Sequence, residues 1–292
     1  MQQLAFWAPR EHAVNVASVP QRSPFRYPGG KTWLIPYIRQ WLARKMNAPA
    51  LLIEPFAGGG IVSLTVAAER LAHHVLMVER DEAVGAVWQT IINGIGGGEW
   101  LAERIASFKI SSDSVTALLA TPASCLREQA FQTIVKNRVT RGGIMAPGAG
   151  LIKEGENGKG LSSRWYPQTL KKRVLDIVQI RERLDFVQGD GLDFFSHYGM
   201  NSEAVFFIDP PYTVAGKRAG SRLYKYSEVN HEELFRLSSK LTGDFLMTYD
   251  DEAEVRSLAK QHGFAVRTVT MKSTHHANMK ELLIGRDLRW LR

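Results

Sequence analysis

Cysteine is almost absent from this chain of 292 residues, because Cys125 is the single one. An intrachain disulfide and a cysteine metal cluster are therefore excluded, and the composition is typical of a reducing compartment. No apolar run approaches the roughly 18 residues that a membrane-spanning helix needs. The opening MQQLAFWAPREH lacks the basic and apolar regions of a signal peptide, so we expect a soluble, cytoplasmic protein.

Acidic residues are also in deficit, with 29 Asp and Glu against 37 Lys and Arg, for a formal net charge of +8. The surplus is concentrated in residues 127–183, here called the basic middle segment, which contain twelve Lys and Arg against five Asp and Glu. A basic surface attracts phosphates and releases their counterions. This distribution favours a polyanionic partner, and a solvated charged helix face is the alternative interpretation.

Apolar runs alternate with helical patterns on both sides of this segment. Strands are predicted at 51–53, 75–78, 184–187, 204–208, 245–248, 264–270 and 282–284. Helices are predicted at 31–44, 61–71, 230–241, after a capping-box pattern of Asn230 and Glu233, and from 252. Parallel strands joined by crossover helices predict an α/β fold with helices on both faces of the sheet.

The middle of the chain, from residue 82 to about 183, is predicted to be mainly helical. Seven glycines between Gly142 and Gly160 predict an irregular stretch within it. The α/β core is therefore split. We expect one discontinuous domain made of residues 1–95 and 184–292, and a second, inserted domain made of residues 96–183.

A glycine-rich turn, EPFAGGG at 54–60, follows the first predicted strand. Open α/β sheets bind ligands at such strand ends, and glycine lets the backbone approach a ligand closely. About twenty residues later Glu79 ends the next strand, where a carboxylate can accept both ribose hydroxyls. The phosphate-loop patterns GxxxxGK[ST] and GxGxxG are missing. The pattern favours a nucleoside site over a structural turn, and S-adenosylmethionine, an adenosine with a sulfonium and an amino acid, fits it.

A second motif, DPPY at 209–212, ends an apolar strand. Prolines donate no backbone hydrogen bond, so the strand must stop and the loop is stiff. The Asp209 carboxylate and the Pro210 carbonyl are then pure acceptors, which suit an amino group with two N–H donors. Their pull makes the nitrogen nucleophilic towards a methyl sulfonium, and Tyr212 offers a face on which a base can stack. A rigid turn is the alternative interpretation.

Together these motifs resemble those of the Dam-type, D12-class adenine-N6 DNA methyltransferases, in the α order that places DPPY last. The resemblance covers about residues 23–95 and 184–286. In the family the similar segments are the N-terminal cofactor motif, the cofactor loop, the strand ending in the ribose-binding acid, the motif near the cofactor adenine, and the closing strand. In this chain they are SPFRYPGGK at 23–31, EPFAGGG at 54–60, LMVERD at 76–81, QGD at 188–190 and MKELLIG at 279–285.

The resemblance implies a Rossmann-like S-adenosylmethionine-dependent methyltransferase sheet and a mainly helical target-recognition insertion at 96–183. It implies site-specific methyl transfer to N6 of a flipped-out adenine in double-stranded DNA, with S-adenosylhomocysteine as product. The implied catalytic residues are Asp209, Pro210, Pro211 and Tyr212. The implied cofactor contacts are Tyr27, Lys31, Glu54, Phe56, Ala57, Gly58, Glu79, Asp190 and Asp209. No metal is expected, because the paired histidines lack metal-ligand spacing.

The middle segment departs most from the family. Asn137 and Arg138 resemble a short N-R element of the recognition region, but the VTRGGIMAPGAG that follows does not continue as in Dam proteins, so a GATC target is not expected. The triplet at 171–173 fits either a DNA contact or a solvated helix face. The DNA contacts expected from the segment are Asn137, Arg138, Arg141, Lys153 and Arg164.

The expected partner is double-stranded DNA, with no membrane, and the resemblance implies a monomer of bacterial or phage origin. A restriction–modification enzyme with a cognate endonuclease encoded nearby, a phage enzyme and an orphan methylase all stay open. RNA or a protein side-chain amide could accept the same chemistry, and an inactive DNA-binding module could keep the same fold. The basic insertion favours nucleic acid, the motif order favours DNA, and the intact DPPY motif favours an enzyme.

Overall fold

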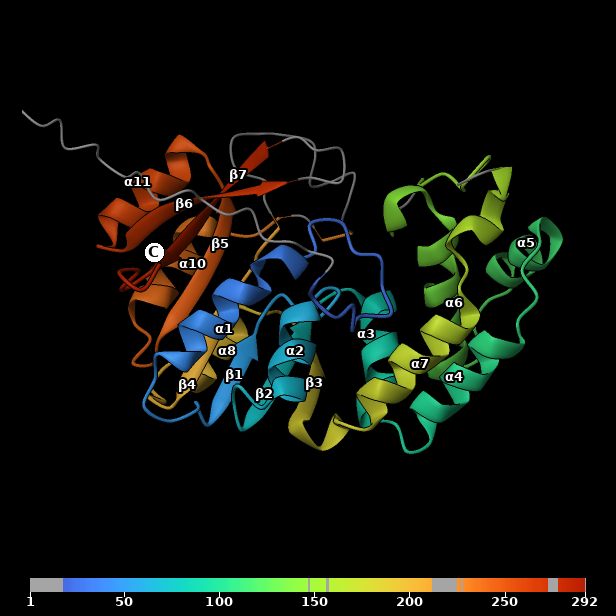
Figure 1. Cartoon of the computed structure of the whole chain (residues 1–292), viewed down its shortest axis with the longest axis horizontal. Helices are drawn as coiled ribbons and strands as arrows, with labels where there is room; N and C mark the ends of the chain where they lie inside the picture. The colour runs from blue at the N-terminus through green and yellow to red at the C-terminus, as the bar shows by residue number, and fades with distance from the viewer. Residues whose placement is uncertain are drawn as a thin grey trace, which may run out of the picture.

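The computed structural model describes residues 18–146, 148–155, 158–211, 225–226, 228–272 and 278–291. A central sheet with helices on both faces lies beside a helical lobe (Figure 1). Within the described ranges the strands are β1 (Leu51–Glu54), β2 (His74–Glu79), β3 (Leu184–Gln188), β4 (Ala204–Ile208), β5 (Phe245–Asp250), β6 (Ala265–Lys272) and β7 (Asn278–Gly285).

The helices lie in two places, around the sheet and in the helical lobe. Those around the sheet are α1 (Ile35–Ala43), α2 (Ile61–Glu69), α3 (Glu82–Trp88), α8 (Asp193–Tyr198), α10 (His231–Ser239) and α11 (Ala253–Gln261). The helical lobe contains α4 (Gly97–Ser107), α5 (Ser112–Ala120), α6 (Leu126–Val139) and α7 (Pro167–Val178). Short helical turns are η2 (Thr32–Leu34), η3 (Gln89–Asn93), η4 (Arg141–Gly143), η6 (Gly160–Arg164) and η7 (Arg181–Arg183). None of the described helices has the length and apolar character needed to cross a bilayer.

The strand order is β3-β2-β1-β4-β5-β7-β6, and β7 runs antiparallel to both of its neighbours. The other pairs are parallel. The predicted α/β fold is confirmed: this is a doubly wound, Rossmann-like sheet. The strand order reverses at β1: β2 and β3 follow on one side of it, whereas β4 and β5 lie on the other side. Such sheets bind ligands outside the strand carboxyl ends at this switch point. Glu54 ends β1 and Asp209 follows β4, so the two acids lie together at the switch point.

Strand side chains alternate between two apolar cores, because successive residues of a strand point to opposite faces. Leu52 and Val205 belong to the core that contains α1 and α2. Ile53 and Phe206 belong to the core that contains α8, α10 and α11. All five residues of β4 are buried, as expected for a strand covered on both faces.

The helical lobe does not have a core of its own. Helix α4 packs on α7, and α6 packs on α3 from the sheet domain. Buried side chains of α6, such as Phe131 and Ile134, belong to the same apolar core as β1 and α2. The lobe is therefore joined to one face of the sheet through continuous apolar packing, which makes its position relative to the sheet a property of the core.

Some local features differ from the sequence prediction. Helix α8 was not predicted, because six residues are too few to show a helical period. The pattern at Asn230 forms only half of a capping box: its side chain accepts from the Glu233 backbone N–H at 3.0 Å. The glycine-rich stretch is irregular where it is described, apart from short turns and an isolated bridge between Thr140 and Leu151.

Asn137 ties the lobe to the loop of residues 23–31, here called the Tyr27 loop. Its side chain is fully buried near the end of α6. Its oxygen accepts from the Arg26 N–H at 2.8 Å, and its nitrogen donates to the carbonyls of Arg26 at 3.0 Å and Gly143 at 2.8 Å. Gly143 is required at this contact, because an added Cβ would lie 2.1 Å from the Arg26 oxygen.

Substituting Asn137→Ala should lower the free energy of unfolding by about 1–3 kcal/mol, because it leaves buried backbone groups of Arg26 without their partner. Urea denaturation measures the change. Asn47→Ala is the matched control, since Asn47 is exposed and should change stability by less than about 0.5 kcal/mol. Equal stability of the two variants would contradict the role assigned to this tie.

Candidate active site

A pocket of about 880 Å³ opens at the switch point. Its floor comes from the carboxyl ends of β1, β2 and β4, and its walls come from the Tyr27 loop and the helical lobe. Among its lining residues are Tyr27, Lys31, Glu54, Phe56, Ala57, Gly58, Glu79, Asp190, Asp209, Pro210 and Pro211. The structure therefore brings together every sequence-predicted cofactor residue and three of the four DPPY residues. Tyr212 lies outside the described residues.

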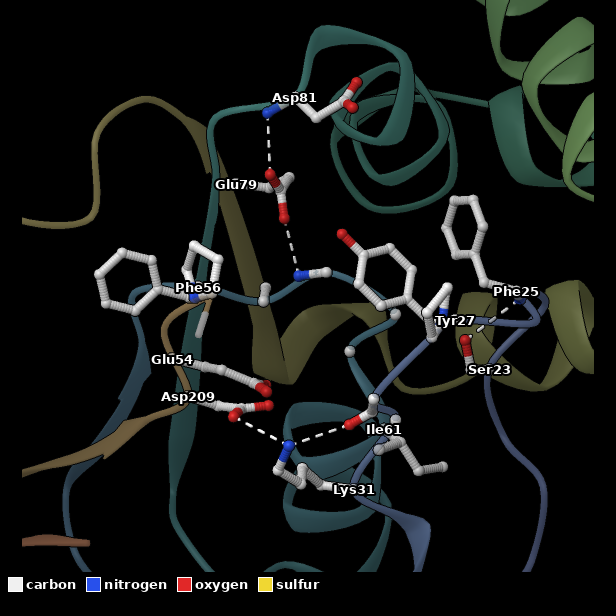
Figure 2. A pocket seen from close by; sticks show the side chains of 18 of the residues that line it. Ser23, Phe25, Tyr27, Lys31, Glu54, Phe56, Ile61, Glu79, Asp81 and Asp209 are labelled. Atoms are coloured by element: carbon white, nitrogen blue, oxygen red, sulfur yellow. Dashed lines mark hydrogen bonds and ion pairs between the residues drawn. The ribbon is translucent and has the colours of Figure 1, made fainter. Parts of the chain in front are cut away.

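The turn at 54–60 is shaped by glycine. Gly58 has φ +47°, and an added Cβ would lie 2.6 Å from Cε1 of Tyr27. The tyrosine ring therefore packs directly on the turn, which only a residue without a side chain permits. Trp88 holds the turn from behind, since its Nε1 donates to the Gly58 carbonyl at 2.9 Å. In Figure 2 the rings of Tyr27 and Phe56 lie on opposite sides of this turn.

Glu79 is fixed at the end of β2 by two backbone donors. The Gly58 N–H donates to its Oε2 at 2.7 Å and the Asp81 N–H to its Oε1 at 2.8 Å (Figure 2). Desolvation raises the pKa of Glu79 to about 7, and these bonds oppose the rise. Asp190 lies at the rim of the same pocket. It accepts from the Leu192 N–H at 3.0 Å and pairs with Arg80 at 3.4 Å.

Glu54 is bonded within the protein at the start of α2. Its Oε2 accepts from the Ser63 N–H at 3.0 Å and from the Ser63 hydroxyl. Only 4% of the residue is exposed, and burial raises the pKa of Glu54 to about 8. The nearby carboxylates of Asp209 and Glu79 act in the same direction. Glu54 therefore holds a proton near neutral pH while it borders the pocket.

Lys31 is the cation at the centre of the site, and only 3% of it is exposed. Its Nζ lies 3.0 Å from Asp209 Oδ1 and 3.7 Å from Glu281 Oε2, and it donates to the Gly29 carbonyl at 3.0 Å. The Thr248 hydroxyl, from the neighbouring β5, donates to the same Asp209 oxygen at 2.7 Å. Figure 2 shows the carboxyl groups of Glu54 and Asp209 side by side above Lys31. Burial also raises the pKa of Glu281 to about 7, against the effect of Lys31.

The residues expected to contact DNA fall into two groups. Arg141 and Lys153 are exposed on neighbouring turns of the lobe, and Arg164 is partly exposed at the pocket wall. Asn137 and Arg138 are buried. The Asn137 side-chain nitrogen already donates to the carbonyls of Arg26 and Gly143, which argues against a direct contact between Asn137 and a base. The triplet at 171–173 divides as well, since Lys171 and Lys172 pair with surface acids whereas Arg173 faces the pocket.

Residues 27–93 match the sequence model of the D12 class N6 adenine-specific DNA methyltransferases. The chain is an S-adenosylmethionine-dependent methyltransferase. The match runs from Tyr27 through β1, α2 and β2 to the end of η3, and so confirms the family resemblance over the cofactor half of the pocket. The DPPY half lies beyond the matched residues. No curated protein matches this sequence.

Several solved structures are similar to this methyltransferase at low identity. An rRNA methyltransferase, AviRa from Streptomyces viridochromogenes, is 15% identical with a TM-score of 0.39, over 89% of this chain and 86% of that one. A precorrin-6y C5,15-methyltransferase from Geobacter metallireducens is 11% identical with a TM-score of 0.35, over 85% of this chain and 84% of that one. Scores this low carry no weight for the substrate, and the fold assignment rests on the strand order.

Sequence reasoning missed three polar residues of the site. Ser63 holds Glu54, Thr248 holds Asp209, and Glu281 flanks Lys31. Glu281 had a detectable signal, because an acid inside the apolar strand MKELLIG needs a buried partner. Ser63 and Thr248 had none, since a hydroxyl in a helix or strand is common and only the fold shows what it faces.

The methyltransferase without cofactor should lose stability as the pH rises from about 4.5 to 8. Folded Glu54 keeps its proton up to about pH 8, whereas an unfolded glutamate releases it near 4.5, so the folded state binds more protons in this window. Glu54→Gln can still accept both bonds from Ser63 and should reduce the loss. Urea denaturation at pH 5.5 and 7.5 measures it.

The exposed Glu203 provides the control for this measurement, because Glu203→Gln should keep the wild-type difference between the two pH values. If Glu54→Gln kept that difference too, Glu54 would not be the buried acid responsible.

Proposed function

We propose that the chain transfers a methyl group from S-adenosylmethionine to N6 of an adenine extruded from double-stranded DNA, at a specific target sequence. One observation carries the proposal: Asp209, after β4, shares a pocket with the glycine turn of β1 and with Glu79 of β2. An acceptor for an amine therefore lies beside a nucleoside cradle. The family match over residues 27–93 supports the cofactor, and the DNA substrate is that of the family.

The residues present fit the cofactor. Ala57 and Gly58 line the pocket with almost no side chain, so a nucleoside can approach the backbone of the turn, and Glu79 lies beside it. We assign the ribose to Glu79, the adenine to the neighbourhood of Phe56 and Asp190, and the methionine end to the Tyr27 loop. S-adenosylmethionine supplies, when bound, a methyl group on a positively charged sulfur. The acids that border the pocket favour such a cation.

Asp209 and Pro210 are assigned to the substrate amine. The Asp209 carboxylate is held by Lys31 at 3.0 Å and by Thr248 at 2.7 Å, so its orientation is set before any substrate binds. The carboxylate and the Pro210 carbonyl then each accept a hydrogen bond from one N–H of the amino group. Fixed acceptors stabilise the positive charge that develops on the nitrogen. We keep Tyr212 as the proposed stacking partner of the base.

Residues 96–183 are proposed as the target-recognition domain. The target amine lies inside the duplex stack, so the adenine must leave it, at a cost of a few kcal/mol for unstacking. Arg141 and Lys153 are exposed on the lobe and are proposed to contact the duplex. The continuous core between lobe and sheet fixes the distance between this surface and the pocket.

Replacing the proposed amine acceptor, Asp209→Ala, should abolish methyl transfer to DNA while the dissociation constant for S-adenosylmethionine changes by no more than about tenfold. Calorimetry measures cofactor binding, and transfer of tritiated methyl groups measures turnover. Asp185→Ala removes an exposed acid of β3 and should leave both unchanged. Substantial turnover by the Asp209 variant would refute the role given to this carboxylate.

The polymer substrate can be identified by offering DNA, RNA and protein to the wild type with tritiated cofactor. We expect label in DNA, and specifically in N6-methyladenine. Label confined to RNA or protein would overturn the proposed substrate. Modified-base sequencing of DNA from an expressing host then gives the target sequence. The neighbouring genes show whether the enzyme serves restriction–modification, a phage or regulation.

A further inference from the structure

The end of the pocket nearest the helical lobe carries four arginines, Arg26, Arg138, Arg164 and Arg173. They come from four separate segments: the Tyr27 loop, α6, η6 and α7. Segments up to 147 residues apart in the sequence thus place guanidinium groups on one surface. Tyr166, whose hydroxyl donates to the Ser163 carbonyl at 2.7 Å, lies at the same end.

Arg138 lies deepest among the four. It is 5% exposed, and its Nε is buried without a hydrogen-bond partner. Burial, and to a smaller extent the charges of Arg173, Arg26 and Arg164, together lower the pKa of Arg138 to about 9. A buried cation among like charges is unfavourable unless an anion joins it.

The part of the chain that the structure describes supplies carbonyl groups but no carboxylate to the two innermost arginines. Among the described residues, Arg138 donates to the Pro24 carbonyl and Arg173 to the Ser23 carbonyl at 3.0 Å, and neither forms an ion pair. A guanidinium group has five N–H donors, so these bonds use only part of its capacity. Holding the Tyr27 loop therefore does not account for the charge gathered here.

Acidic and basic side chains gather at opposite ends of the pocket. Glu54, Glu79 and Asp209 lie at the sheet end, whereas the arginines lie at the lobe end. The sheet end suits the cationic cofactor. The lobe end suits an anion, and arginine is the side chain that binds phosphate oxygens in pairs.

We propose that Arg26, Arg138, Arg164 and Arg173 form a subsite for a DNA backbone phosphodiester, the one next to the extruded adenine. This subsite rests on the proposed function, because an extruded nucleotide brings its own phosphates to the mouth of the pocket. The phosphate neutralises the cluster and positions the strand, while the acids at the other end hold the cofactor and the amine.

The first test measures binding without turnover. A mixed-sequence single-stranded DNA of 12 nucleotides can enter the pocket without extrusion, and its affinity is titrated against salt concentration. Arg164→Gln should reduce the slope of log K against log salt by about 0.7, the value for one phosphate contact on a single strand. Arg236→Gln, in an exposed pair with Glu233 on α10, should leave the slope unchanged.

Arg164 is chosen because Arg138 and Arg173 also hold the Tyr27 loop. The conservative Arg138→Lys variant adds a second measurement. A lysine keeps the charge but loses the paired N–H donors. We expect it to keep the salt slope while binding DNA about tenfold more weakly. Wild-type affinity in this variant would contradict paired recognition of a phosphate.

The second test uses a duplex that carries the target sequence, in which single phosphates near the adenine are replaced by neutral methylphosphonates. One position should lower kcat/KM of the wild type by about tenfold or more, and the same replacement should have little further effect on Arg164→Gln. Equal losses in the two proteins at every position would overturn the subsite.

The outcomes separate the subsite from the proposed function. An unchanged salt slope in Arg164→Gln overturns the phosphate site, whether or not the wild type methylates DNA. Weakened S-adenosylmethionine binding with an unchanged slope also overturns it, because the cluster would then hold the cofactor carboxylate. A reduced slope in a protein that methylates only RNA would support the phosphate site and remove DNA from the proposed function.

Discussion

The pairing of the Lys31 ammonium with the Asp209 carboxylate is the contact on which the site depends. Lys31 reaches it from the Tyr27 loop, Asp209 follows β4, and Glu281 joins them from β7. Bringing several acids into a desolvated pocket is costly, and a buried cation offsets part of that cost. Without Lys31, the carboxyl groups at the switch point would repel one another and the Tyr27 loop would lose its anchor at this end.

The same loop also connects the two halves of the molecule. At one end it carries Lys31 into the acidic site, and at the other end it is held by Asn137, Arg138 and Arg173 from the lobe. The proposed cofactor site and the proposed DNA-binding lobe therefore share one backbone segment. A shift of the lobe on DNA would therefore move the Tyr27 loop, and with it the Tyr27 ring that packs on the glycine turn.

The pocket is also organised by charge. Glu54, Glu79 and Asp209 lie at the strand ends, whereas Arg138, Arg164 and Arg173 come from the lobe, so a cation and an anion each suit one end. Protonation limits the repulsion within the acidic half, because burial raises the pKa of Glu54 to about 8 and that of Glu281 to about 7. Asp209, held by Lys31 and Thr248, is the acid placed to face the substrate amine.

The sequence alone determined the α/β fold, the glycine turn and the cofactor resemblance. These depend on neighbours along the chain: apolar runs form strands, and Gly58 must adopt a positive φ where strand turns into helix. Only the tertiary structure decided that Asn137 is buried, that Thr248 contacts Asp209 and that Glu281 lies beside Lys31. It also decided that four arginines meet at one end of the pocket. Such contacts join residues distant in sequence, so strand order and helix packing create them, and no local pattern records them.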